Sequence, residues 1–203
     1  MLVTQLHKHM KARAVVFSFL LLTFARLCSA AETETAVFGA GCFWCVEAFY
    51  EQQPGVKNVV SGYAGGTAAN PNYKQVSAGQ TSHAEVVQLE FDPAVTSYEK
   101  LVEFFWKPHD PTDGRGVAPD FGKQYRPLIL FRTPEQQSIA EKSKAALTAK
   151  IGKPVAVRIE PLDKFYPAEE YHQDYVVKNP KDGYVVGVAI PKLKKLGLKV
   201  PGQ

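Results

Sequence analysis

The residues whose types and spacing suit chemistry are Cys42 and Cys45, three residues apart in the stretch GAGCFWCVEAFY at 39–50. A thiol in the first turn of a helix faces unpaired backbone N–H groups and the positive end of the helix dipole. We therefore expect the pKa of Cys42 to be lowered and its thiolate to attack electrophiles. Side chains three residues apart share one helix face and lie within disulfide reach. The pair can therefore cycle between dithiol and disulfide.

A chemical role for this pair is favoured over a structural one. A disulfide between residues 42 and 45 closes almost no loop, so it stabilises little. A zinc site would need two further ligands, and the histidines after residue 31 have no ligand-pair spacing; they are His83, His109 and His172. We therefore expect no metal. A dinucleotide-binding turn is also excluded, because Trp44 stands where its third glycine would be.

The chain around the cysteines predicts the elements that must position them. Val37 and Phe38 have the pattern of a strand end, and a helix is expected from Cys42 to about Gln52. Further strands are expected within 56–66, 83–93, 128–131 and 155–159, and further helices after the Thr96–Glu99 capping box and after Thr133. Between them, 107–127 is a long loop rich in Gly and Pro, a kind that is often functional. The intermingled pattern alone predicts one α/β or α+β domain.

Residues 1–31 differ in composition from the rest of the chain. A basic start is followed by an apolar run from Ala14 to Ala25 and then by small residues, which is the layout of a secretory signal peptide. The run is too short for a comfortable membrane span, although Arg26 near the cleavage site leaves an uncleaved anchor as the alternative. We therefore expect a periplasmic or secreted protein that is free of the membrane after leader cleavage.

The net charge of residues 1–31 also differs from that of the rest of the chain. The chain holds 24 Lys+Arg and 20 Asp+Glu, and residues 1–31 hold four of the basic residues and none of the acidic ones. The remaining chain is thus formally neutral, so the basicity indicates no nucleic-acid-binding surface. The final residues, 191–203, are expected to form an extended tail with a solvated basic face.

Several blocks of sequence besides the cysteine motif occur in an order that resembles one known family. They are GCFWCVEAFY at 41–50, GYAGG at 62–66, NPNYKQV at 70–76, GQTSHAEVV at 79–87, FWKPHDPT at 105–112, DFGKQYR at 120–126 and AEEYHQDY at 168–175. Together they resemble the methionine sulfoxide reductase A family, the peptide-methionine (S)-S-oxide reductases. The resemblance implies a catalytic domain over residues 32–190. It also implies an α+β fold, a two-layer sandwich with a ferredoxin-like core and extra loops.

The resemblance implies four residues that act on the sulfoxide. Cys42 matches the nucleophile and Glu85 the acid near the sulfoxide oxygen, while Tyr73 and Tyr125 match the tyrosines that hydrogen-bond this oxygen. A sulfoxide sulfur is a poor electrophile until its oxygen gains a proton or a strong hydrogen bond. Burial would raise the pKa of Glu85 and keep it protonated, and phenols stabilise charge on oxygen. After the attack, methionine leaves and Cys42 becomes a sulfenic acid.

Other matched residues imply a substrate pocket and its support. Phe43 and Trp44 match the pocket for the S-methyl group, although either aromatic alone would be typical of core packing. Asp120 matches the aspartate that holds the substrate backbone. Glu47 and His172 are matched too, and we expect them to give structural support. No metal or organic cofactor is implied.

The recycling step departs from many relatives, which carry recycling cysteines in the C-terminal tail. No cysteine follows Cys45 in this chain. We therefore predict that Cys45 resolves the sulfenic acid, giving a Cys42–Cys45 disulfide that an exported thioredoxin-like partner reduces. The alternative is an outside thiol that attacks Cys42 directly. The expected function is repair of protein-bound or free methionine sulfoxide outside the cytoplasm, by a monomer.

A thiol–disulfide oxidoreductase that acts on protein disulfides is the competing function, because it would use the same cysteine pair. Such an enzyme would not need Glu85, Tyr73 or Tyr125. Its usual cis-proline loop in a thioredoxin-like fold is not recognisable in this sequence. A third alternative is a non-catalytic module that binds oxidised peptides.

Overall fold

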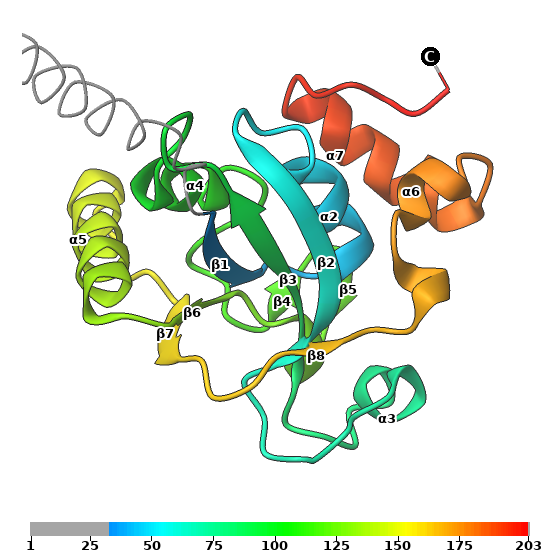
Figure 1. Cartoon of the computed structure of the whole chain (residues 1–203), viewed down its shortest axis with the longest axis horizontal. Helices are drawn as coiled ribbons and strands as arrows, with labels where there is room; N and C mark the ends of the chain where they lie inside the picture. Colours follow the sequence, from blue (N-terminus) through cyan, green and yellow to red (C-terminus); the bar gives the residue numbers. More distant parts are fainter. Residues whose placement is uncertain (1–32, 203) are drawn as a thin grey trace, which may run out of the picture. The chain divides into compact units, whose positions relative to one another are not determined.

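The computed structural model describes residues 33–202, and the signal peptide predicted for residues 1–31 lies outside them. The strands are β1 (Glu34–Gly39), β2 (Val56–Ala64), β3 (Ala84–Phe91), β4 (Gly116–Val117), β5 (Asp120–Phe121), β6 (Leu128–Phe131), β7 (Arg158–Pro161) and β8 (Tyr166–Pro167). The α-helices are α2 (Phe43–Tyr50), α3 (Tyr73–Ser77), α4 (Tyr98–Phe105), α5 (Pro134–Ile151), α6 (Tyr175–Lys178) and α7 (Ile190–Lys195) (Figure 1). Shorter helical segments are η1 (Lys123–Tyr125), η2 (Glu170–His172) and the π-helical η3 (Val185–Ala189).

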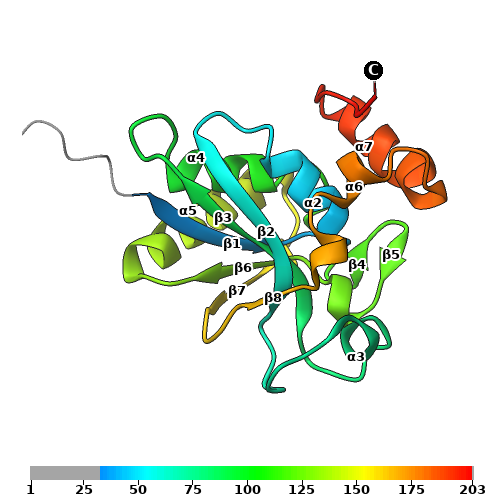
Figure 2. The same cartoon turned by 45° about the vertical axis from the view of Figure 1, so that its right-hand side comes forward.

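Six of the strands form one sheet in the order β7-β6-β1-β3-β2-β8. β1 pairs antiparallel with β3 and β6, whereas β7 is parallel to β6. Successive β1 side chains alternate, so Phe38 joins the large apolar cluster and Val37 joins a smaller one on the opposite face. Residues of α2, α4 and α5 belong to the large cluster, so these helices cover that face (Figures 1 and 2). The fold is therefore a mixed arrangement of a central sheet and helices, as the intermingled pattern predicts.

The helix starts follow the capping rules, with one error in the prediction. Thr133 caps α5 as expected, because its side chain accepts a hydrogen bond from the Gln136 amide and Pro134 stands at the first helical position. The expected Thr96–Glu99 box is wrong by one residue. Ser97 caps α4 by accepting from the Lys100 amide, while Thr96 is buried and its own amide donates to Asp92.

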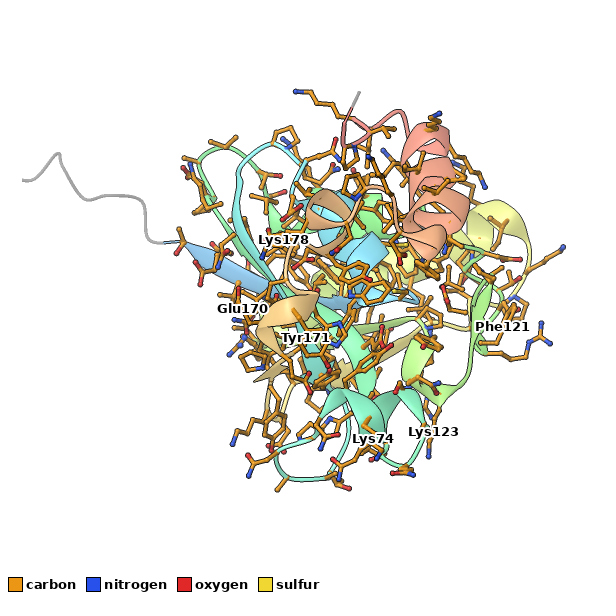
Figure 3. The ribbon with its side chains drawn as sticks, turned by 90° about the vertical axis from the view of Figure 1, so that its right-hand side faces the viewer. Lys74, Phe121, Lys123, Glu170, Tyr171 and Lys178 are labelled. Carbon is orange, nitrogen blue, oxygen red and sulfur yellow. The ribbon has the colours of Figure 1, made fainter. Side chains whose placement is uncertain are left out.

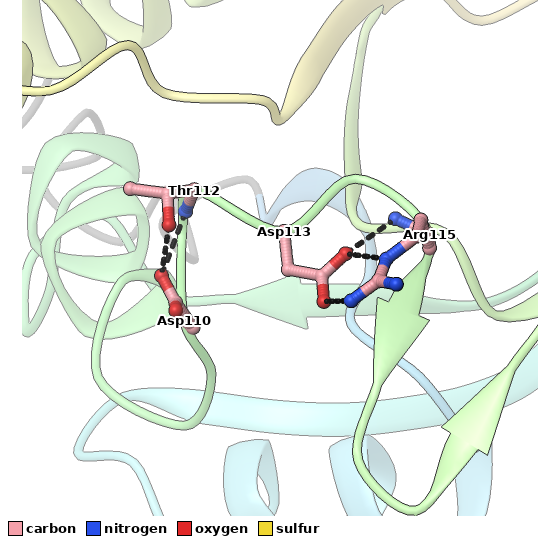
Figure 4. Close-up of polar contacts among 4 residues, drawn as sticks. All are labelled: Asp110, Thr112, Asp113 and Arg115. Atoms are coloured by element: carbon pink, nitrogen blue, oxygen red, sulfur yellow. Dashed lines mark hydrogen bonds and ion pairs between the residues drawn. The ribbon is translucent and has the colours of Figure 1, made fainter.

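The Gly- and Pro-rich stretch 107–127 is an ordered connection rather than an open loop. Asp110 accepts hydrogen bonds from the Thr112 amide and hydroxyl, and Asp113 forms an ion pair of 2.7 Å with Arg115 (Figure 4). The chain then enters the β4–β5 hairpin, whose turn contains a cis Ala118–Pro119 peptide, and continues into η1. This connection carries Asp120 and Tyr125.

The C-terminal segment corrects another prediction. Residues 191–203 were expected to be extended, but α7 covers the first of them as a helix. Leu193 is fully buried in the large apolar cluster, and Leu196 packs against the same cluster one turn later. This spacing gives the lysine-rich segment an apolar face, so it docks on the domain instead of trailing in solvent. Within residues 33–202, no helix is both long and apolar enough to cross a bilayer.

Candidate active site

Cys42 stands at the point where the chain turns from β1 into α2. It is the N-cap residue of this helix, and the preceding Gly41 has a φ of +85°, a conformation that side chains rarely adopt. A Cβ atom at Gly41 would lie 2.8 Å from Cβ of Val117 in the β4–β5 hairpin. Glycine therefore allows both the turn and the close approach of the hairpin. Cys42 is 7% exposed and Cys45, inside the helix, is 1% exposed.

Glu85 lies on β3 and contacts the start of the same helix. The main-chain N–H of Phe43 donates a buried hydrogen bond of 3.1 Å to Glu85 Oε2. Burial raises the pKa of Glu85 to about 8, although the hydrogen bond from Phe43 opposes the shift. Glu85 thus keeps its proton at neutral pH, the direction expected from the sequence. A neutral carboxylic acid therefore lies next to Cys42.

The pKa of the Cys42 thiol is raised, not lowered as the helix-start argument predicted. Burial is the largest cause, and the thiol of Cys45 and the charge of Glu85 act in the same direction. A helix terminus by itself favours the thiolate, but removal of this thiol from water in the folded chain outweighs that effect. The Cys45 thiol has a lowered pKa, chiefly because of its hydrogen bond with Cys42. The Cys45 amide also donates a 3.1 Å hydrogen bond to the Cys42 carbonyl, so the two cysteines stand in one helical turn.

Tyr73 and Tyr125 approach this pair from separate elements. Tyr73 begins α3, and burial followed by the charges of Glu85 and Cys42 raises its pKa to about 12. Tyr125 ends η1, and burial and the charge of Glu85 raise its pKa as well. Both phenols thus stay protonated and can donate. Figure 3 looks towards the face on which α3 and η1 lie, with their exposed neighbours Lys74 and Lys123 labelled.

Phe43 and Trp44 form an aromatic cluster with residues from the C-terminal part of the chain. Phe43 is 1% exposed, and its ring centroid lies 5.0 Å from that of His172. Trp44 is half-buried and stacks on Tyr175, with ring centroids 3.7 Å apart and planes within 6°. The indole Nε1–H donates a 3.0 Å hydrogen bond to His172 Nδ1. His172 therefore orients Trp44, in agreement with the supporting role expected for it.

Asp120 is held by side chains from the C-terminal segment. Its Oδ2 accepts a 2.6 Å hydrogen bond from the Tyr184 hydroxyl and lies 3.9 Å from Lys192 Nζ. The Tyr184 hydroxyl oxygen is in turn 3.9 Å from Cys45 Sγ. Asp120 is thus connected through Tyr184 to Cys45.

Sequence reasoning missed the residues that hold the predicted ones in place. Tyr184 and Lys192 lie beyond the last matched block, towards the end of the chain that was expected to become a tail. Glu169 falls inside a block but carried no signal of its own. Its carboxylate accepts from the Tyr63 hydroxyl at 2.8 Å and from the Tyr73 amide at 2.9 Å, so it fixes the start of α3.

Glu47 is a buried carboxyl outside this chemistry. It is 1% exposed, and its Oε1 has no hydrogen-bond partner among the described residues. Burial raises its pKa to about 8, with contributions from Glu51 and Asp174. The structural role expected for Glu47 stays a prediction. Within residues 33–202, no group of three or more His, Cys, Asp or Glu side chains is arranged to hold a metal ion.

Comparison with known families identifies what this arrangement is similar to. The family described as "Peptide methionine sulfoxide reductase" matches residues 34–200, which includes the segment that holds Tyr184 and Lys192. The peptide methionine sulfoxide reductase MsrA of Listeria monocytogenes serotype 4a is 51% identical over 157 residues, covering 75% of this chain and 89% of the relative.

Two solved structures of a yeast protein are similar as well. Mxr1 from Saccharomyces cerevisiae in reduced form has a TM-score of 0.71 and 34% sequence identity, covering 76% of this chain and 90% of Mxr1. Mxr1 in complex with Trx2 has a TM-score of 0.52 and 26% identity, covering 72% of this chain and 87% of the matched chain.

Proposed function

This chain belongs to the peptide methionine sulfoxide reductase (MsrA) family and is a thiol-dependent oxidoreductase, and we propose that it reduces the S-epimer of methionine sulfoxide through Cys42. One observation carries the proposal. The 3.1 Å hydrogen bond from the Phe43 amide to Glu85 Oε2 holds the acid next to the thiol, and burial keeps this acid protonated. A sulfoxide needs both groups at once, because its oxygen must be protonated as its sulfur is attacked.

In the first half-reaction, Cys42 attacks the sulfur while Glu85 gives its proton to the oxygen. The hydroxyls of Tyr73 and Tyr125 donate to the same oxygen and stabilise the charge that develops there. The hydroxyl then moves from the substrate sulfur to Cys42 Sγ, so an S–O bond forms on Cys42 while the substrate S–O bond and the transient bond between the two sulfurs break. Methionine leaves as the thioether, Cys42 becomes a sulfenic acid, and the proton of the Cys42 thiol replaces the one that Glu85 gave. A neutral Glu85 also assists Cys42, because the charge of an ionised Glu85 is one of the causes that raise the pKa of the thiol.

Phe43, Trp44 and Asp120 hold the substrate. The two aromatic rings provide an apolar pocket for the S-methyl group, and the bond between Trp44 and His172 fixes one wall of it. Asp120 binds the substrate backbone from the hairpin, where Tyr184 already orients its carboxylate. The exposed Phe121 and Tyr171, 52% and 60% exposed, flank this face, which suits a peptide substrate (Figure 3).

Cys45 resolves the sulfenic acid in the second half-reaction. Its sulfur forms a bond with Cys42 Sγ, the Cys42 S–O bond breaks, and the oxygen leaves as water with the two protons of the sulfenic acid and the thiol. Both cysteines are buried within one turn at the start of α2, which supports this pairing. A thioredoxin-like dithiol then reduces the disulfide, by analogy with Mxr1, which was solved in complex with Trx2.

The location of the enzyme is proposed from the leader predicted in the sequence, and the ferredoxin-like core from the strand order. With a cleaved leader over residues 1–31, the enzyme acts as a monomer in the periplasm or outside the cell, where it repairs oxidised exported proteins with an exported reductant. A ferredoxin-like core is supported by the order β6-β1-β3-β2 in the sheet, with α2 after β1 and α4 after β3.

One turnover with a dabsylated S-methionine sulfoxide, in the absence of reductant, tests the function. We expect one methionine per enzyme and, by mass spectrometry, an intramolecular Cys42–Cys45 disulfide. A lasting sulfenic acid would eliminate Cys45 as the resolving residue. Insulin reduction in the absence of sulfoxide reduction would instead favour the thiol–disulfide oxidoreductase.

A further inference from the structure

The resolving cysteine lies beside a polar cluster that gives no proton to the sulfoxide and that includes Asp120, the residue proposed to bind the substrate backbone. This cluster consists of Tyr184, Asp120 and Lys192, contributed by the start of η3, by β5 and by α7. The Tyr184 hydroxyl lies 3.9 Å from Cys45 Sγ and donates to Asp120 Oδ2 at 2.6 Å. Lys192 Nζ lies 3.9 Å from the same carboxylate oxygen. The three side chains thus form a continuous path of polar contacts that ends at Cys45.

The charges in this path act on Cys45 in opposite directions. The cation of Lys192 favours the Cys45 thiolate and the carboxylate of Asp120 disfavours it, while Cys42, Tyr184 and Glu85 are the other titratable groups that face it. The side chains of Lys192 and Asp120 are only 18% and 13% exposed, so water and salt screen them less than a surface pair. Without Lys192, the negative charge of Asp120 would stand uncompensated next to the thiol.

We propose that Lys192 is a positioning residue for recycling, which holds Asp120 and Tyr184 so that Cys45 can carry negative charge. This role rests on the proposed function of Cys45. During resolution, the Cys45 thiolate attacks Cys42 Sγ, the sulfenic oxygen leaves as water, and the S–S bond forms. During reduction, a thiolate of the dithiol partner attacks the disulfide, Cys45 leaves as a thiolate, and the partner's second thiol completes the exchange.

Exposure decides which sulfur the partner attacks. Cys42 is 7% exposed, whereas Cys45 is 1% exposed beneath the C-terminal segment. The partner therefore forms its mixed disulfide with Cys42, and Cys45 is the leaving group. A thiol with a lower pKa leaves faster, so the same cluster assists both halves of recycling.

Lys192→Met tests this role, with Lys195→Met as the matched control. Lys195 lies on the same helix and lines the same cavity of about 480 Å³, but it has no ion pair with Asp120 among the described residues. Rapid quenching at saturating sulfoxide measures methionine release and disulfide formation separately. For a rise of about one unit in the pKa of Cys45, the thiolate fraction of Cys45 falls about tenfold, and the greater nucleophilicity of the remaining thiolate offsets part of this loss. Resolution should therefore slow about threefold or more in Lys192→Met. Methionine release should slow less.

Two further readouts separate charge from packing. Alkylation of Cys45 in a Cys42→Ser background should shift to higher pH in Lys192→Met, and Lys192→Arg should restore both the pH profile and the rate. Lys192→Gln serves if the Met variant unfolds. Unchanged disulfide formation in Lys192→Met, or an equal loss in Lys195→Met, would overturn the role of Lys192. If the wild-type enzyme releases methionine and forms no disulfide, the assignment of Cys45 itself fails, and this inference fails with it.

Discussion

The amide of Phe43 donates a 3.1 Å hydrogen bond to Glu85 Oε2, and this contact joins residues that are 42 positions apart in the chain. The donor is the first residue of α2, directly after Cys42, and the acceptor is a buried side chain of β3. One bond thus connects the helix that follows the proposed nucleophile to the strand that carries the proposed acid. It also sets the distance between the two groups that act on one S=O bond in the proposed reaction.

Glu85→Gln should remove the acid and keep this contact, because an amide oxygen can still accept from Phe43. We expect the rate of methionine formation in a single turnover to fall by about 10²–10⁴, the usual contribution of general acid catalysis. The matched control is Glu90→Gln on the same strand, which should retain the wild-type rate. A wild-type rate in the Glu85→Gln variant would eliminate Glu85 as the acid.

His172→Ala should affect the substrate pocket through Trp44. The variant removes the acceptor of the 3.0 Å indole bond and a ring that packs on Phe43, so the KM for the sulfoxide should rise about three- to tenfold, in line with a lost hydrogen bond of about 1 kcal/mol. The rate at saturation should change less. Ser143→Ala is the control, because the Ser143 hydroxyl accepts a 2.8 Å hydrogen bond from the indole of Trp106. The KM of the Ser143→Ala variant should match that of the wild type.

Glu47 should make the fold less stable as the pH rises. Its pKa is raised from 4.5 to about 8 in the folded state, so the folded protein holds a proton that the unfolded chain has already lost. Stability therefore falls as the pH rises through this window and levels off above about pH 8.

Glu47→Gln cannot lose this proton, so its stability relative to wild type should increase by about 1–3 kcal/mol between pH 5 and pH 8. Urea unfolding at the two pH values measures the difference. Glu103→Gln, on the exposed side of α4, is the control and should show no such change. The same pH dependence in Glu47→Gln and wild type would contradict burial of Glu47 as the cause.

Leu193→Ala should show that the C-terminal segment belongs to the domain. Leu193 is fully buried in the large apolar cluster, and its truncation should cost about 2–4 kcal/mol of unfolding free energy. The control is Lys194→Ala at the exposed neighbouring position, which should change stability little. Thermal or urea unfolding measures the stability of both variants. An unchanged midpoint in Leu193→Ala would indicate that the segment does not contribute to the core.

Local patterns predicted the parts of the fold that depend on neighbouring residues. The helix that follows Cys42 and the cap of α5 at Thr133 were predicted from residues within a few positions of each other, and both are present. The same local reasoning placed the cap of α4 at Thr96, because Ser97 and Thr96 are chemically equivalent until one of them is buried. The same local reasoning predicted an extended tail for residues 191–203. A segment with few apolar residues gives no sign of a buried helix until the surface on which it packs is known.

The sequence by itself determined the candidate reactive groups and the order of the matched blocks, since residue types and spacing are properties of the chain. Tertiary structure alone decided their environment. Burial raises the pKa of Cys42 where the helix terminus predicted a lower one, and it keeps Glu85 protonated. Tyr184 and Lys192 reach the surroundings of Cys45 only because η3 and α7 fold back over α2. The physical reason is that desolvation and Coulomb forces act through space, so they depend on contacts between residues far apart in the chain.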